Sequence, residues 1–307
     1  MASDTSSKSG SRSGSRSGSR SSGAARLARQ RRTRLLVQRV LIYALLIFVA
    51  LLVVLPLLWM LSTSLKPKAE WFTREIHWLP ITFTLENYRT LLDNPSTPIA
   101  RWFLNSFMVA TISTVLTLTV TSLAAYAYAR MDFPGRRGLY TLLLATLFMP
   151  GIMFLIPNFL TIYRLGLLNS YTGVIIPGLA GVFGVFFLRQ FFESIPRELE
   201  ESAEIDGATK FQTFYKIVLP LSKPALATLG ILTFLASWND FLWPLLILRD
   251  RALQTLPPGL RTLQGAYTSE YGLMMAGAVV VAVPVLVIYL FLQRFIVESV
   301  ASTGLKN

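Results

Sequence analysis

Residues 102–129 have the sequence WFLNSFMVATISTVLTLTVTSLAAYAYA, with Arg101 directly before them and Arg130 directly after them. No charged side chain occurs in these 28 residues. A helix that crosses a lipid bilayer needs about 20 predominantly apolar residues. The stretch is therefore long enough to predict a transmembrane helix that the two arginines bound.

Five further runs share this character. They are Val40–Leu65, Gly138–Tyr163, Leu165–Leu188, Pro224–Leu248 and Tyr271–Gln293. All 29 Lys and Arg lie outside the six runs, and of the 16 acids only Asp240 lies inside one. The whole chain is 15% charged, against roughly 25% in a typical soluble protein. We therefore predict an all-α integral membrane protein with six transmembrane helices, over about 40–62, 103–128, 139–161, 171–188, 224–247 and 271–293.

The distribution of Lys and Arg predicts the orientation of these helices, because cytoplasmic segments carry the excess of positive residues. With a cytoplasmic N-terminus, the inside segments hold 20 Lys and Arg and the outside segments hold 9. Six spans place both termini on the same side. We therefore expect both termini in the cytoplasm.

The N-terminal segment, residues 1–39, is basic and of low complexity. It has ten Lys and Arg and one acid, and it repeats Ser-Gly-Ser-Arg three times from Ser9 to Arg20. Such a composition cannot form a packed core, so we expect a disordered cytoplasmic tail ahead of a membrane domain over residues 40–307. The positive charge suits contact with anionic lipid better than a nucleic-acid partner.

Several classes of chemistry are excluded by what the sequence lacks. The chain has no cysteine, one histidine (His77) and no Gly-x-x-x-x-Gly-Lys-Ser/Thr phosphate-binding motif. Thiolate metal sites, multi-histidine metal sites and a Walker-type ATPase site are therefore ruled out. We predict a protein that is not an enzyme, has no cofactor or metal, and takes its energy from another subunit.

The longest interior loop, Arg189–Lys223, differs from the other cytoplasmic segments because it carries six acids against five cations. Ser194 and Pro196 suit the start of a helix, and Gly207 suits a left-handed end. Phe211, Phe214, Tyr215 and Val218 then recur at helical spacing, and Pro220 is expected to end the second helix. The loop is predicted to form two short amphipathic helices that meet at Gly207.

The same loop resembles the signature loop of ABC importer permeases. That pattern is Glu-Ala-Ala, three residues, Gly, nine residues, Ile, one residue, Leu-Pro. Here its matching positions are Glu201, Ser202, Ala203, Gly207, Ile217, Leu219 and Pro220, with the centre formed by Asp206, Gly207 and Ala208. The single departure is Ser202 in place of the middle alanine. The resemblance implies that these residues couple the protein to a separate ATPase.

Shorter peptides are similar to the carbohydrate-importer branch, in its maltose-type six-span subunit. They include Asn105-Ser106, Asp132-Phe133-Pro134-Gly135, Trp238-Asn239-Asp240-Phe241 and Gly304-Leu305-Lys306. The resemblance implies a type I permease fold in a bacterial or archaeal cytoplasmic membrane. It also implies three partners: a second permease subunit in a heterodimer, two copies of a cytoplasmic ATPase, and an extracytoplasmic solute-binding protein that contacts the loop Arg249–Glu270.

Asp240 marks a candidate solute path. It lies about 24 Å along a helix counted from Pro224, and Pro244 leaves its carbonyl without an N–H partner. Together with Trp238 and Asn239 it offers polar groups beside aromatic rings, as sugar sites do. The alternative to a solute path is that these residues belong to the belt of aromatic side chains at the membrane surface, with Asp240 as a single acid within it.

Two other classes of function remain open from the sequence. A secondary carrier would show internal repeats or several intramembrane charges, and neither occurs in this sequence. A membrane receptor or scaffold would use the two-helix loop to bind a signalling partner. An ATPase that co-purifies with the chain would distinguish an importer subunit from a receptor.

Overall fold

The computed structural model describes residues 17–71, 73, 75, 77–95, 97–266 and 271–304, with side chains from residue 34 onward apart from 262–266 and 292–304. Every regular element within these residues is a helix. The chain divides into two compact units, Met1–Trp59 and Met60–Asn307. Three helices are long and apolar enough to cross a membrane, or up to six if each bent pair counts as one.

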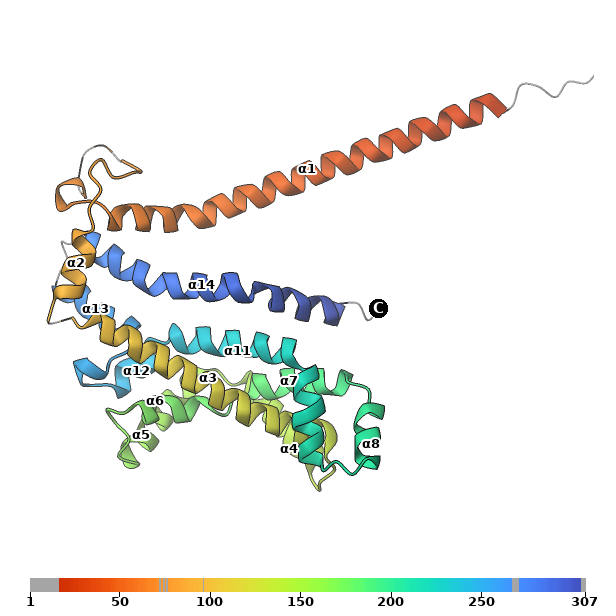
Figure 1. Ribbon diagram of the computed structural model, residues 1–307. Helices are drawn as coiled ribbons and strands as arrows, with labels where there is room; N and C mark the ends of the chain where they lie inside the picture. Colours follow the sequence, from red (N-terminus) through yellow and green to blue (C-terminus); the bar gives the residue numbers. More distant parts are fainter. Residues whose placement is uncertain are drawn as a thin grey trace, which may run out of the picture. The chain divides into compact units, whose positions relative to one another are not determined.

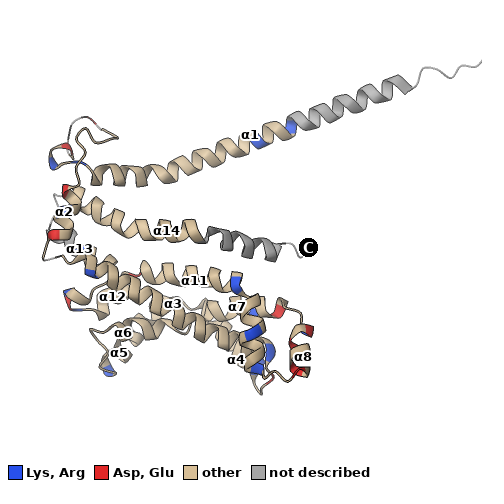
Figure 2. Cartoon of the chain, in the orientation of Figure 1, with Lys and Arg blue, Asp and Glu red and all other residues tan. Residues whose placement is uncertain are grey.

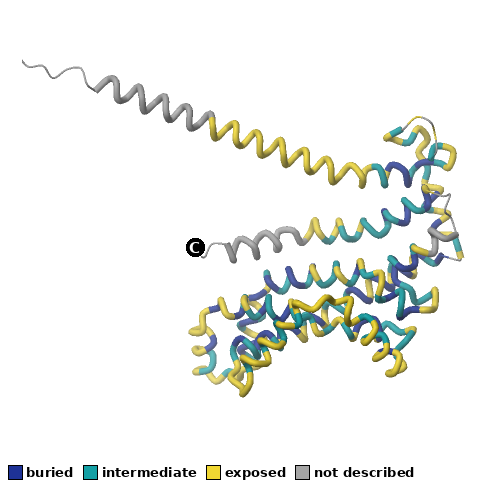
Figure 3. The backbone as a smooth tube through the Cα atoms, turned by 180° about the vertical axis from the view of Figure 1, so that it is seen from behind, coloured by how far each residue is buried: buried dark blue, intermediate teal, exposed yellow. Residues whose placement is uncertain are grey.

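Helix α1 (Ser17–Ser64) contains the first apolar segment, over Arg34–Ser64 (Figure 1). Every residue from 34 to 58 is exposed in the isolated chain (Figure 3), as expected for a surface that lipid covers. The helix begins at Ser17, inside the segment for which the sequence predicts disorder. The Leu, Ala, Arg and Gln residues that follow Gly23 are good helix formers and can extend a helix that the membrane segment nucleates. Residues 1–16 lie outside the described part.

The second unit is built around α3 (Ile99–Arg130), which packs against α7 (Val182–Ser194) and α11 (Lys223–Trp238). Helix α14 (Tyr271–Gly304) packs on α11 and on α2 (Glu86–Asp93) (Figure 1). Small residues on α3 and α11, among them Ala110, Ala125 and Ala225, are fully buried and let the helix backbones approach closely. The charged residues lie mainly at helix ends, with several acids on α8 (Glu198–Ile205) (Figure 2).

The predicted third and fourth spans form as broken helices. Helix α4 (Arg136–Ala145) with η2 (Thr146–Phe148) is bent by 100° against η3 (Gly151–Phe154) with α5 (Leu155–Arg164). Helix α6 (Tyr171–Ile175) with η4 (Ile176–Gly178) is bent by 47° against α7. Each break lies at or beside a Pro-Gly pair, Pro150-Gly151 or Pro177-Gly178, because proline removes a helical hydrogen bond and glycine tolerates the turn.

The predicted fifth span, over 224–247, is also broken into two helices. Helix α11 ends at Trp238, residues 239–241 break the helix, and α12 (Leu242–Ile247) follows as a short separate helix. At its other end α11 is bent by 78° against the helical segment Lys210–Leu221. The remaining short elements are η1 (Lys68–Glu70), α9 (Lys210–Thr213), η5 (Phe214–Val218), α10 (Leu219–Leu221), η6 (Arg251–Leu253) and α13 (Leu256–Ala266).

Candidate functional site

Helix α8 ends in a left-handed turn at Gly207, as the sequence predicts. Gly207 has φ +86°, its N–H donates to the Glu204 carbonyl at 3.0 Å, and the N–H of Ala208 donates to the Ala203 carbonyl at 2.9 Å. These two bonds form a Schellman motif, which satisfies carbonyls that the helix end leaves free. The turn fixes the angle at which the chain leaves α8.

The outward face of α8 combines acids with an apolar side chain. Residues 198, 201, 202 and 205 share one face by their spacing of three and four. Glu198, Glu201 and Ser202 are exposed, and Ile205 is 87% exposed. An isoleucine so exposed next to carboxylates suits a surface that another protein covers. We call Glu198, Glu201, Ser202 and Ile205 the outer face of α8.

The inward face of α8 is attached to α3 by a buried ion pair that the sequence analysis missed. Glu200 Oε1 lies 2.5 Å from Arg130 Nε, and the two side chains are only 8% and 6% exposed. Arg130 Nη2 also donates to the carbonyls of Phe192 and Ile195, at 2.6 and 2.7 Å. Arg130 therefore joins the end of α3, the end of α7 and helix α8.

Tyr126 adds a third member to this contact. Its hydroxyl lies 3.4 Å from Glu200 Oε2 and 3.3 Å from the carbonyl of Lys210, and its ring packs on Phe214 with centroids 4.9 Å apart. Tyr126 and Arg130 are four residues apart and so lie on one face of α3. We call Tyr126, Arg130 and Glu200 the clamp, because they connect both loop helices to α3.

The second loop helix differs in part from the prediction. Thr209 and Gln212 form a capping box at its start, and Phe214–Val218 form a π-helical turn. Phe211 contacts both Phe214 and Tyr215, with ring centroids 6.3 Å apart, but only Phe214 and Val218 are buried, and Phe211 and Tyr215 are 65% and 52% exposed. The wider turn rotates the residues on either side of it away from regular helical spacing. Ile217 and Leu219 are half-buried, and Pro220 lies inside the last turn, α10.

The three residues of the candidate solute path lie in different environments. Trp238 is fully buried, stacks with Phe234 at 5.9 Å and packs edge-on against Phe103 at 5.4 Å. Asn239 is exposed, and its amide donates to the carbonyl of Leu235. Asp240 accepts a bond of 3.4 Å from the N–H of Trp243 at the start of α12. Asp240 lines a cavity.

This cavity, which we call the central cavity, has a volume of about 360 Å³ and lies among α3, η3, α5, η4, α11 and α12. Its lining includes six polar side chains: Ser113, Thr117, Asn158, Thr233, Ser237 and Asp240. On α3, Ser113 lies 14 residues after Ile99, or about 21 Å along the helix, and 17 residues before Arg130, or about 26 Å. The cavity is thus about halfway along α3.

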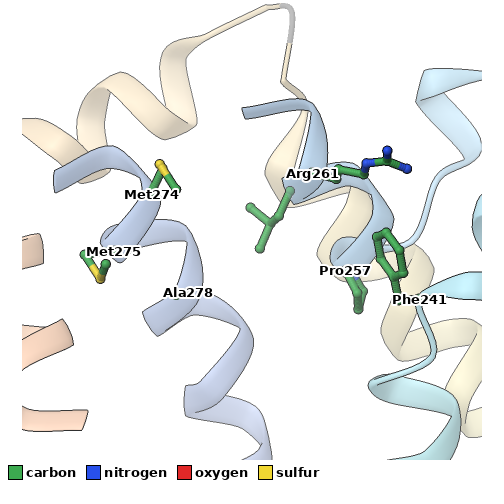
Figure 4. A pocket seen from close by; sticks show the side chains of 7 residues that line it. Phe241, Pro257, Arg261, Met274, Met275 and Ala278 are labelled. Carbon is green, nitrogen blue, oxygen red and sulfur yellow. The ribbon is translucent and has the colours of Figure 1, made fainter. Parts of the chain in front are cut away.

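A second cavity, of about 650 Å³, lies between α12, α13 and α14 (Figure 4). Met274, Met275 and Ala278 line one side. On the other side the Arg261 guanidinium lies 6.0 Å from the centre of the Phe241 ring. A cation beside an aromatic ring and two adaptable methionines make an amphipathic surface.

The loop after α12 is packed closely onto the start of α3. The Trp102 indole donates to the Arg251 carbonyl at 2.7 Å, and the Asn105 amide donates to the carbonyls of Ala252 and Gln254. Gly259 lies against the Trp102 ring, where an added Cβ would meet ring atoms at 2.5 Å. Asn105 thus has a structural role, and the Pro257-Pro258-Gly259 sequence forms part of helix α13.

The sequence matches known proteins over most of its length. Residues 118–301 match the family described as binding-protein-dependent transport system inner membrane component. The arabinooligosaccharides transport system permease protein AraQ of Halalkalibacterium halodurans is 38% identical over 85% of this chain and 94% of its own. The sulfoquinovosyl glycerol transport system permease protein SmoH of Agrobacterium fabrum is 39% identical over 82% and 88%.

A solved structure is also similar. A chain from a bacterial ABC transporter involved in the import of the acidic polysaccharide alginate gives a TM-score of 0.75 at 26% identity. The match covers 84% of this chain and 96% of that chain.

Proposed function

The chain belongs to the family of binding-protein-dependent transport system inner membrane components, and on this premise we propose that it forms part of the translocation path for a sugar or oligosaccharide. It is a permease subunit of an ABC importer, and it has no ATPase site of its own. Two of the relatives named above belong to transport systems for arabinooligosaccharides and for sulfoquinovosyl glycerol. The similar solved structure is of a transporter involved in the import of alginate. This shared saccharide chemistry supports a sugar as the solute.

The proposed topology has six spans with both termini in the cytoplasm of a bacterium or archaeon. Three long helices and three bent pairs supply enough apolar segments for six crossings. The excess of Lys and Arg in residues 1–39, 130–137, 189–223 and 294–307 supports the orientation. In this arrangement residues 1–39 are a basic cytoplasmic tail, residues 40–307 form the permease domain, and the clamp lies on the cytoplasmic side.

The outer face of α8 is the proposed docking surface for a cytoplasmic ATPase. The observation that carries this assignment is the opposite orientation of two neighbouring glutamates. Glu200 is buried in the clamp, while Glu201 is exposed beside Ile205. A helix that is fixed on one side and offers a charged and apolar surface on the other can transmit movement between two proteins. The proposed coupling residues are Glu201, Ser202, Ala203, Asp206, Gly207, Ala208, Ile217, Leu219 and Pro220.

The proposed assembly contains this chain, a second permease chain, two copies of the ATPase and a solute-binding protein on the outside. The loop Arg249–Glu270 is the proposed contact for the binding protein. Asp240 is the proposed member of the solute path, with Asn239 near its exposed edge. The proposed role of Trp238 is to pack in the core behind this path and not to contact the solute.

Co-purification with an ATPase tests this function. We expect the tagged chain, expressed with the permease and ATPase genes encoded beside it, to retain the ATPase in detergent. ATP hydrolysis should then rise severalfold when the sugar-loaded binding protein is added to the reconstituted complex. If the chain purifies without an ATPase while its membrane insertion is normal, the receptor alternative is favoured and the importer assignment fails.

Gly207→Val is expected to weaken coupling, because a β-branched residue resists the left-handed conformation. The cost of that conformation is roughly 1–2 kcal/mol for a residue with a Cβ. No atom lies within 4 Å of an added Cβ at Gly207, so backbone strain is the only expected cause.

Gly207→Asn is the matched control, because asparagine adopts this conformation readily. Stimulated ATP hydrolysis should fall severalfold with valine and stay close to wild type with asparagine. Equal losses for the two variants would contradict a requirement for the turn.

A further inference from the structure

Three helix breaks meet at the central cavity. Gly151 follows the 100° bend between α4–η2 and η3–α5, Gly178 precedes the 47° bend before α7, and Asp240 lies in the break between α11 and α12. A broken helix leaves backbone polar groups unpaired, and at membrane depth these groups must be buried in protein or face water. Discontinuous helices that converge midway across a bilayer are a typical architecture for a solute site.

The hydroxyl groups around the cavity differ from several other hydroxyl groups of the same helices. Thr114, Thr119, Thr121 and Thr161 each donate to a carbonyl four residues earlier, which is the usual way for a helix to satisfy such a group. The side chains of Ser113, Thr117, Asn158, Thr233 and Ser237 make no hydrogen bond to any other part of the chain that the structure describes. Their donors and acceptors are therefore free for whatever occupies the cavity.

The charge of the cavity is a single carboxylate. Asp240 is the only ionisable residue in its lining, and no Lys or Arg is present there. No described cation forms an ion pair with Asp240; its hydrogen bond comes from the N–H of Trp243. An anionic solute would bring a second negative charge close to this carboxylate in a poorly screened environment.

We propose that the central cavity is a subsite of this subunit for one uncharged sugar unit, and that Asp240 disfavours an anionic unit there. The inference rests on the proposed function and adds to it the location of a solute subsite and the chemical class of the solute. The volume of about 360 Å³ lies within the range of roughly 300–1,000 Å³ for small-molecule sites. Sugar hydroxyls can pair with the free hydroxyl and amide groups, and Trp243 supplies an apolar wall.

The first experiment probes hydration and charge without any sugar. The chain has no cysteine, so Ser237→Cys places the single thiol of this subunit on the cavity wall. We expect this thiol to react with both a cationic and an anionic methanethiosulfonate. The ratio of the cationic to the anionic rate should fall roughly tenfold when Asp240→Asn is added, because the nearby negative charge is lost.

Leu232→Cys is the control for this labelling, because Leu232 lies on the same helix and is 47% exposed away from the cavity lining. Its rate ratio should not respond to Asp240→Asn. An unreactive thiol at position 237, or a ratio there that Asp240→Asn leaves unchanged, would overturn the proposal.

The second experiment measures uptake with variants that remove one hydroxyl. Thr117→Val should reduce uptake of neutral oligosaccharides roughly tenfold, because a hydrogen bond to solute is lost. Thr119→Val is the matched control, since Thr119 is exposed on the same helix and bonds to the carbonyl of Val115. Asp240→Asn should raise the uptake of uronate oligosaccharides relative to neutral ones.

ATP hydrolysis separates failure of this proposal from failure of the proposed function. In the Thr117→Val transporter the loaded binding protein should still stimulate hydrolysis, because the coupling loop is unchanged. Full neutral-sugar uptake by Thr117→Val, with stimulation intact, would overturn the cavity assignment and leave the importer function standing. Absence of stimulation in the wild-type complex would count against the importer function itself.

Discussion

Glu201→Lys is expected to release the ATPase from the membrane and to abolish solute-stimulated ATP hydrolysis. Glu201 is exposed on the outer face of α8, one helical turn before the exposed Ile205. In the assembled transporter the contact would be largely buried, and loss of one partner of a buried charged pair costs about 2–5 kcal/mol. This corresponds to an affinity at least roughly 30-fold weaker, and the reversed charge adds repulsion.

Asp132→Lys is the matched control for this charge reversal. Asp132 is highly exposed on another segment of the proposed cytoplasmic side, where its ion pair with Arg136 is of the surface type that contributes about 0–1 kcal/mol. Membrane abundance should be normal for both variants, and ATPase should be lost only with Glu201→Lys. If that complex keeps a bound and fully stimulated ATPase, the outer face of α8 is not the coupling surface.

The features that the sequence predicted well depend on residues close together in the chain. The left-handed end of α8 follows from Gly207 and the preceding helix, and the Schellman bonds span only five residues. The apolar segments depend on composition alone, and three helices of the described chain are long and apolar enough to cross a membrane, or up to six if each bent pair counts as one. Both the conformational preference of a turn and the free energy of transfer into lipid are set by residues close together in the chain. Both can therefore be read from the sequence.

The features that the sequence did not predict depend on distant residues or on departures from regular helix. Glu200 and Arg130 form a buried ion pair although they are 70 positions apart, and no local pattern in the sequence links them. The full burial of Trp238 likewise depends on distant residues, because its ring packs against Phe103 of α3 and its indole donates to the carbonyl of Val281 on α14. The one local signal was the spacing of Tyr126 and Arg130, which puts two polar groups on one face at the end of an apolar helix.

Arg130→Met is expected to be the most destabilising single change in and around the two loop helices. It would leave the Glu200 carboxylate buried without its partner, which costs about 3–5 kcal/mol. The carbonyls of Phe192 and Ile195 would lose their donor as well. We expect lower abundance of the folded protein in the membrane, a lower unfolding temperature in detergent, and loss of coupling because α8 is no longer held against α3.

The double variant Arg130→Met with Glu200→Met tests whether the clamp positions α8 or only stabilises the fold. It removes both charges, so no unpaired carboxylate remains, and apolar replacement of a buried ion pair is often tolerated. Abundance should recover to a large extent, while coupling should stay impaired because the bonds to the Phe192 and Ile195 carbonyls are still missing. Glu204→Gln is the control on the same helix, since its ion pair with Lys210 is largely exposed and contributes little. A double variant as unstable as Arg130→Met, or an Arg130→Met protein with normal coupling, would show that the clamp does not position α8.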